Sequence, residues 1–273
     1  MDRTPPSHVE INLEWDDFVW KDPEGGLVYL HGVLPTVVYP NSLRPRIKWS
    51  GLGLMVSEEE IELWEHEEEL EKKSPGINFT GAISQGGDFS RLLGGLSLLE
   101  NIQTCKFPDP EPRRLLIAAQ SEAGSGSRPI FFVEPDDEEW TEWVESCADE
   151  MTRPLRLLGS VFGGRAWKKE LVRAMKNARP PRLEKNEDKA RGLAEASSLS
   201  AAWWWRSEAS FTDELRNQRD ARLVARLRGA LSVLREGQVD VDIPPVLLVP
   251  VMQAWMPSIH NALLDEPKPE SME

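Results

Sequence analysis

The sequence is poor in cysteine, with only Cys105 and Cys147 among 273 residues. The two stand far apart, and neither has a partner at the short spacing typical of a zinc module. A disulfide framework and a structural zinc site are therefore not expected. A reducing compartment, the cytoplasm, suits such a chain best.

Long apolar runs are also lacking. The most apolar stretch, residues 243–257, is short and interrupted by four prolines, so it does not have the form of a membrane helix. Residues 1–10 lack the basic start and apolar run of a signal peptide. The sequence therefore predicts neither a signal peptide nor a membrane span.

Positive charge is scarce relative to negative charge: 32 lysines and arginines face 46 acidic residues, which gives a net charge of −14. A field of that sign repels the backbones of nucleic acids and anionic lipid surfaces. Nucleic acid is therefore not an expected partner. The basic segment 216–228 is interpreted as the solvated face of a helix.

Several sequence signatures of catalysis are missing. No Gly-Xaa-Ser-Xaa-Gly elbow occurs, and the glycine-rich segment 84–95 lacks the Gly-Lys-Ser/Thr ending of a phosphate loop. A cysteine hydrolase would need an imidazole base beside a thiolate, and His31 with Cys105 is the available pair. The local signature around this cysteine is incomplete, so this alternative is not favoured.

The residues that are present predict a folded α/β protein. Hydrophobic residues make up 40% of the chain and charged residues 29%, which is ordinary globular usage. Short apolar runs alternate with longer amphipathic stretches, as in a mainly parallel or mixed central sheet covered by helices. The predicted buried strands are 27–30, 52–56, 115–119, 130–133 and 246–251.

Helices are predicted after Ser57, over residues 136–151, and from Ser210 to about Gly237, where leucines recur on one face. The first of the two longer helices places Cys147 in the core. Candidate loops or lids are 84–95, 108–114 and 179–189. We expect one α/β domain over 1–264, a helical insertion at 179–208 that carries Trp203–Trp205 mainly as core residues, and a disordered acidic tail at 265–273.

Four segments follow one another in the same order as the motifs of a known family. They are Val28-Tyr29-Leu30-His31-Gly32-Val33-Leu34-Pro35, then Leu54-Met55-Val56-Ser57, then 130–136, and finally Arg219-Asp220-Ala221-Arg222-Leu223 with 249–259. Together they resemble the TraB/PrgY/GumN family, whose relatives include ChaN-like and erythromycin-esterase-like proteins. The resemblance covers about two thirds of the chain and implies a metalloprotein-like α/β fold.

The departures from the family pattern fall on groups that bind metals or move protons. Pro35 stands at the position of the first histidine, Ser57 follows the second strand without its acid, and Ala254-Trp255 replaces the glycine-histidine step. Proline has no ligating side chain, and the tryptophan indole only donates hydrogen bonds. The resemblance therefore implies a noncatalytic relative that lacks a cofactor and acts as a binding, assembly or regulatory partner.

The sequence thus leaves two classes of function open. In a noncatalytic protein, with a protein partner or as a homo-oligomer, the candidate pocket is formed by Gly32, Pro35, Glu134, Arg219 and Trp255 at the carboxyl ends of the strands. An ion pair between Arg219 and Glu134 is expected there. The alternative is a divergent, peptidase-like hydrolase that holds zinc or manganese at a relocated site, made by His31, Glu134 and His260.

Overall fold

A computed structural model of the protein describes residues 13–121, 127–153, 163–184, 186–237 and 243–272. Its centre is a five-stranded sheet in the order β1-β2-β5-β3-β4, in which β1 is antiparallel to β2 and the other neighbours are parallel. The strands are β1 (Phe18–Lys21), β2 (Leu27–Val33), β3 (Gly51–Leu54), β4 (Ile130–Phe132) and β5 (Val246–Met252). The predicted α/β fold with a mainly parallel sheet is confirmed.

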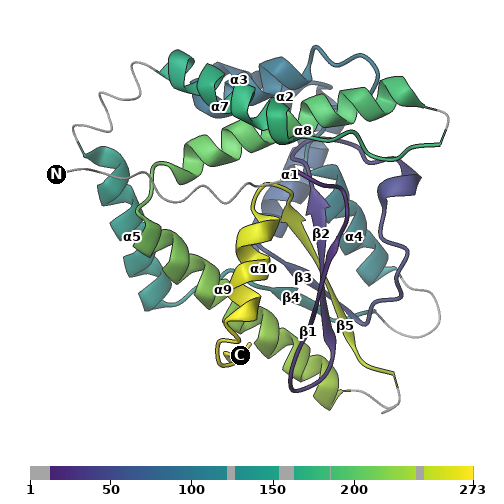
Figure 1. Cartoon of the computed structure of the whole chain (residues 1–273), viewed down its shortest axis with the longest axis vertical. Coiled ribbons are helices and arrows are strands. Elements are labelled where there is room, and N and C mark those ends of the chain that lie inside the picture. Colours follow the sequence, from purple (N-terminus) through teal and green to yellow (C-terminus); the bar gives the residue numbers. More distant parts are fainter. Residues whose placement is uncertain (1–12, 122–126, 154–162, 185, 238–242, 273) are drawn as a thin grey trace.

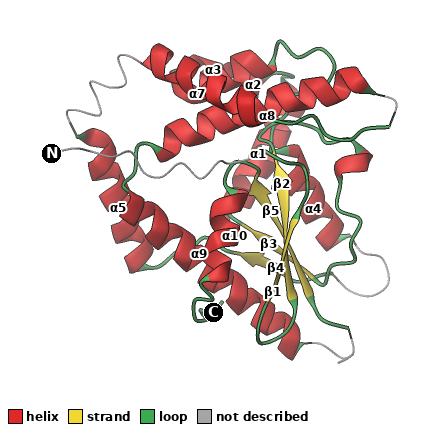
Figure 2. Ribbon diagram, in the orientation of Figure 1, coloured by secondary structure: helices red, strands yellow, loops and turns green. Residues whose placement is uncertain are grey.

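Helices cover both faces of this sheet, as Figures 1 and 2 show. On one face α9 (Asp213–Glu236) and α10 (Met256–Leu264) pack on side chains such as Val28, Leu30 and Val249. On the other face α1 (Glu59–Lys73) and α4 (Pro110–Gln120) pack on side chains such as Leu52, Leu54 and Leu248. Because β5 is buried on both faces, its sequence is a continuous apolar run rather than an alternating one.

A second helical layer lies beyond the carboxyl end of β2 (Figure 1). It is made by α2 (Ile77–Ser84), α3 (Gly87–Leu96), α7 (Gly163–Asn177) and α8 (Glu187–Glu208). The chain that leaves β2 packs into this layer, since Leu34, Val37 and Tyr39 share a core with Leu92 of α3 and Leu193 of α8. Within α8, Trp205 is buried and its two tryptophan neighbours are half-buried.

Four of the predicted strands are confirmed, but residues 115–119 are helical. They belong to α4, whose first turn carries Pro110, a residue that suits that position. Leu115, Leu116 and Ala119 are buried, while Ile117 is 47% exposed, which is the one-sided burial of a helix. Short apolar runs fit a strand and a buried helix equally well, and the tertiary structure decides between them.

Segment 84–95, expected as a loop, is also mostly helical. Gly86 and Gly87 have φ angles of 74° and 79°, which lets α2 and α3 follow each other with only Gln85 and Gly86 between them. α3 then buries Leu92, Leu93 and Leu96. The predicted connector 108–114 is wrong over residues 110–114, because α4 begins at Pro110.

The other helix predictions hold with shifted caps. α5 (Glu138–Thr152) buries Cys147, as expected. α9 buries the leucines that recur on one face and is capped by Gly237; these leucines are Leu215, Leu223, Leu227, Leu231 and Leu234. Its cap is Thr212 rather than Ser210, since the Thr212 hydroxyl accepts a hydrogen bond from the Leu215 amide. The expected loop at 179–189 gives way to α8 at Glu187.

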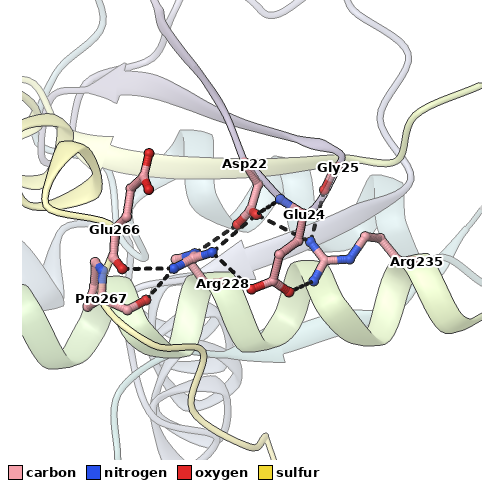
Figure 3. Close-up of polar contacts among 7 residues, drawn as sticks. All are labelled: Asp22, Glu24, Gly25, Arg228, Arg235, Glu266 and Pro267. Atoms are coloured by element: carbon pink, nitrogen blue, oxygen red, sulfur yellow. Dashed lines mark hydrogen bonds and ion pairs between the residues drawn. The ribbon is translucent and has the colours of Figure 1, made fainter.

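Residues 265–272 lie along α9, which corrects the expectation of a disordered tail. The Arg228 guanidinium donates to the carbonyl oxygens of Glu266 and Pro267 at 3.0 and 2.5 Å (Figure 3). The Glu270 amide donates to the Ala225 carbonyl at 3.0 Å. A Cβ at Gly229 would stand 1.8 Å from the Glu270 carbonyl oxygen, so glycine is required for this close approach.

The same arginine ties the β1–β2 turn to α9. Asp22 is buried and accepts from Arg228 Nε at 2.8 Å, while Arg235 pairs with Glu24 at 2.9 Å (Figure 3). The turn itself depends on Gly25 and Gly26, which both have positive φ angles. Among the described residues, no helix has the length and apolarity that crossing a bilayer requires.

Candidate functional site

The predicted pocket residues do not form one site. Arg219 and Trp255 lie together, with the guanidinium carbon 4.6 Å from the centre of the indole ring. Arg219 pairs with Glu208 at 2.7 Å and with Asp220 at 2.8 Å, and the Trp255 indole donates to Asp220 at 3.0 Å. The expected ion pair between Arg219 and Glu134 is therefore wrong.

The remaining pocket candidates are packing residues or lie elsewhere. Gly32 leaves room for Met256, since a Cβ there would stand 3.2 Å from the methionine methyl carbon. Pro35 is buried in the turn after β2. Glu134 follows β4 and accepts from the Trp140 indole at 3.2 Å, and burial raises the pKa of its carboxyl group.

The alternative metal set is not assembled either. His31 contacts Asp17, Glu134 contacts Trp140, and His260 stacks on Phe18 with ring centres 4.7 Å apart. In the part of the chain that the structure describes, no three histidine, cysteine or acidic side chains are placed to hold a metal ion. The ligand set predicted from His31, Glu134 and His260 is therefore wrong.

The thiol of Cys105, the nucleophile of the cysteine-hydrolase alternative, packs among apolar side chains. The Cys105 thiol points toward the Leu93 carbonyl oxygen at 3.6 Å, among the apolar side chains between α3 and α8. Burial raises the pKa of this thiol, which disfavours the thiolate that a nucleophile needs.

A different group of polar side chains surrounds His31 near the carboxyl end of β2. Alternate residues of a strand share a face, so Tyr29 and His31 point to the same side. Asp17, just before β1, accepts from the Tyr29 hydroxyl at 2.6 Å and lies 2.8 Å from His31 Nδ1. His31 is only 2% exposed. Burial and the neighbouring carboxylate raise the pKa of Tyr29.

Glu111 closes this group from the first turn of α4. It is 1% exposed, and its carboxylate lies 3.8 Å from His31 Nε2, 3.6 Å from Arg44 Nε and 3.0 Å from Arg114 Nε. A helix amino end favours a carboxylate through its dipole. Tyr39 meets His31 edge to face, and burial raises its pKa well above the usual range, helped by Glu111 and Asp17.

Four buried polar atoms in and beside this group have no hydrogen-bond partner among the residues that the structure describes. They are His31 Nε2, Tyr39 Oη, Thr36 Oγ1 and Arg44 Nε. Thr36 also has a φ angle of 57°, a strained value for a β-branched residue. Buried polar atoms almost always find a partner, and strained residues gather at functional sites. The concentration of both features indicates a site that binds polar atoms.

A cleft of about 590 Å³ opens beside this buried group, and Asp17, Tyr29 and Arg44 belong to both. Segments 14–17, 42–46 and 179–182 form its walls. Four arginines line it, against three carboxylates, in a chain whose net charge is −14. The arginines are Arg44, Arg46, Arg179 and Arg182. We call this feature the arginine cleft.

Three of these arginines form no ion pair within the described residues, whereas Arg44 lies 3.6 Å from the Glu111 carboxylate. The motifs Arg44-Pro45-Arg46 and Arg179-Pro180-Pro181-Arg182 meet across the cleft, and proline keeps both segments out of helices. Without a helix there is no carboxylate one turn away. Arg179 donates only to backbone carbonyls, and within the described residues Arg46 and Arg182 form no ion pair.

A smaller cavity of about 300 Å³ lies at the carboxyl ends of β3 and β5 and contains Glu60, Glu67 and Asp109. Burial, together with the charge of neighbouring carboxylates, raises the pKa of Glu67 to about 7 and that of Asp109 to about 6. Asp109 also accepts from the Thr36 amide at 2.7 Å. The carboxyl groups of Glu67 and Asp109 can therefore exchange protons near neutral pH.

The sequence pointed to only part of this arrangement. It singled out His31 and the segment 179–189, which both belong to the region, but not Asp17, Glu111 or Arg44. The two arginine-proline motifs are the signal that was available. Comparisons with protein families, with curated proteins and with solved structures find no match to this chain.

Proposed function

We propose that this chain is a noncatalytic binding protein of the TraB/PrgY/GumN type, and that its arginine cleft holds an anionic group of its ligand. The observation that carries the proposal is the meeting of two arginine-proline motifs, in which Arg46, Arg179 and Arg182 form no ion pair within the described residues. A guanidinium presents paired donors that match the oxygens of a carboxylate or phosphate. Such a protein acts as a binding, assembly or regulatory partner.

The surroundings of the two replaced family positions support the noncatalytic part of the proposal. Pro35 is buried and carries no ligating atom. The Trp255 indole is occupied by Asp220, whose carboxylate also accepts from the Ser258 hydroxyl and from Arg219. These polar groups satisfy one another, which is the role of a structural network.

The size and charge of the cleft support the anionic ligand. Its volume of about 590 Å³ lies within the range of sites for small molecules or for a few residues of a peptide. Trp15 and Tyr29 add aromatic surface to the lining. Asp17 and Glu111 hold the neighbouring polar side chains in place, so that the arginines surround a prepared site.

Isothermal titration calorimetry with citrate and with pyrophosphate tests this function. We expect saturable binding of at least one of these probes, and binding about tenfold weaker in the double variant Arg46→Gln with Arg182→Gln. The matched control is Arg191→Gln, an exposed arginine on α8 outside the cleft lining. Absence of binding to the wild-type protein, or equal weakening in the control, would contradict the proposal.

A hydrolase is the second candidate, and the cavity around Glu60, Glu67 and Asp109 is the observation that favours it. Here Glu67 would serve as a general acid or base near neutral pH. Hydrolysis of model peptides and esters that is lost in Glu67→Gln would establish this alternative.

A further inference from the structure

A second cleft is bordered by acidic side chains, in contrast to the arginine cleft. It encloses about 940 Å³ and is formed by α1, α4, α5 and the edge strand β4. Its floor is apolar and consists of Ile61, Leu116, Ile130, Phe132 and Val144. The Val144 side chain of α5 is 47% exposed. β4 is an edge strand, and exposed edge strands are surfaces on which another chain can dock. We call this feature the acidic groove.

The rim of the acidic groove is negative throughout. Six carboxylates border it: Glu58, Glu59, Glu62, Glu65, Glu134 and Asp136. No lysine or arginine belongs to its lining, and within the described residues none of the six takes part in an ion pair. An apolar floor between unpaired carboxylates is complementary to an apolar stripe flanked by basic side chains.

The molecule itself carries such a stripe on α7. Arg165, Lys168, Val172 and Met175 follow one another at spacings of three and four, so they lie on one side of the helix. Val172 is 45% exposed and Met175 is 60% exposed. Lys169 and Lys176 flank them, and the helix contains five basic residues and one acidic residue, Glu170. An exposed apolar pair within a basic face indicates a docking surface.

The opposite side of α7 is already in use. Ala174 is fully buried and shares a core with Ala201 and Ala202 of α8, while Trp167 and Leu171 pack against the same cluster. α7 is therefore fixed to its own copy with the basic stripe outward. A second copy has to supply the helix that enters the acidic groove.

We propose that the acidic groove docks the basic stripe of α7 from a second copy of this chain, with Val172 and Met175 on the apolar floor and the lysines against the carboxylates. The proposal goes beyond the ligand of the arginine cleft and does not depend on it. The two surfaces differ, so the contact is head to tail, and each copy in a pair keeps one free groove and one free helix. Assembly therefore continues into chains or closes into a ring.

The strength of this contact follows from its size. α7 has 15 residues and is about 22 Å long, so one side of it buries a small interface, at the weak end of stable contacts. Charge pairs at the rim are screened by salt. Association is therefore expected to grow with protein concentration and to decline as salt is added.

Light scattering coupled to size-exclusion chromatography tests the proposal with two disabled forms. The groove variant, Glu62→Lys with Glu65→Lys, keeps an intact α7. The helix variant, Val172→Ser with Met175→Ser, keeps an intact groove and changes only exposed positions. Each variant alone is expected to be monomeric at concentrations where the wild type is larger than a dimer, and an equimolar mixture is expected to stop at a one-to-one dimer.

Controls separate this contact from nonspecific charge effects. Glu187→Lys with Glu195→Lys, at two exposed glutamates of α8, matches the charge change of the groove variant and should assemble like the wild type. Circular dichroism of each variant verifies that it is folded. A wild type that stays monomeric at low salt overturns the proposal. So does assembly that survives in the helix variant, because another surface would then occupy the groove.

Discussion

The arginine cleft and the acidic groove show how one chain keeps two kinds of unpaired charge. In the cleft, Arg46, Arg179 and Arg182 stand beside prolines outside the helices, and none of the three forms an ion pair within the described residues. In the groove, the glutamates do stand on a helix, but α1 places basic residues only in its last turn, at Lys72 and Lys73. Both regions leave charge free for a ligand or partner, and they do so by opposite local means.

The arginines of α9 form the contrasting case. Several of them form ion pairs within the fold: Arg219 pairs with Glu208, Arg228 with Asp22, and Arg235 with Glu24. Composition alone does not distinguish these structural arginines from those of the cleft. What separates them is whether a carboxylate lies within reach after folding.

The largest effect is expected where a structural arginine is removed. Arg228→Ala removes the guanidinium that bonds the fully buried Asp22 carboxylate at 2.8 Å and leaves it the more distant Arg235, at 3.6 Å. Breaking a buried ion pair from one side costs about 3–5 kcal/mol of the free energy of unfolding. Urea denaturation measures this loss. Arg182→Ala in the cleft is the matched control and should stay within about 0.5 kcal/mol of the wild type; equal losses would erase the distinction between the two kinds of arginine.

An intermediate effect is expected at Gly229, where the carboxyl-terminal segment crosses α9. A methyl group in Gly229→Ala would collide with the Glu270 carbonyl, so the segment has to move, at a cost of about 1–3 kcal/mol. Its departure frees Arg222 and Arg226 from Glu270. Faster cleavage after Glu270 by a glutamate-specific protease reports the movement. Gly237→Ala, with an ordinary 3.5 Å contact, should be cleaved at the wild-type rate.

A pH effect is expected from the small acidic cavity. Folding raises the pKa of Glu67 from 4.5 to about 7 and that of Asp109 from 3.8 to about 6, so the folded state binds more protons than the unfolded state in between. The free energy of unfolding therefore falls as pH rises through this window. Denaturant midpoints between pH 4.5 and 7 should decline in the wild type and decline less in Glu67→Gln. A midpoint that rises over this window contradicts the raised pKa values.

The smallest effect is expected at the free charges themselves. Arg46→Gln and Glu62→Gln remove side chains that form no ion pair in the described structure, so each should change the free energy of unfolding by less than about 0.5 kcal/mol. Thermal denaturation of both variants provides the measurement. A larger loss in either would mean that the charge contributes to the fold rather than to binding.

Much of the fold could be predicted because burial leaves a pattern along the chain. The leucine spacing of α9 predicts a helix, and the apolar run of β5 predicts a buried strand. The prediction was wrong at 115–119, where a strand and a helix give the same short run. It missed β1, which buries only Trp20 and exposes Val19, so its alternation covers too few residues to stand out.

The candidate site was less predictable because it depends on contacts between distant segments. His31 was a candidate ligand in the sequence, and it lies in β2, two residues before the strand ends. Its partners come from far away: Asp17 precedes β1, and Glu111 begins a helix that was expected to be a connector. No local pattern joins these residues, whereas the two arginine-proline motifs were legible in the sequence.

Anion binding in the cleft is measured most directly by a nuclear magnetic resonance titration that observes arginine side-chain Nε–Hε signals while pyrophosphate is added. Signals of the cleft arginines, Arg46, Arg179 and Arg182, are expected to shift and saturate together. Those of Arg219 and Arg228, which are held by carboxylates, should remain in place. Shifts confined to α9, or no saturable shift at all, would contradict the claim that unpaired guanidinium groups in the cleft bind an anion.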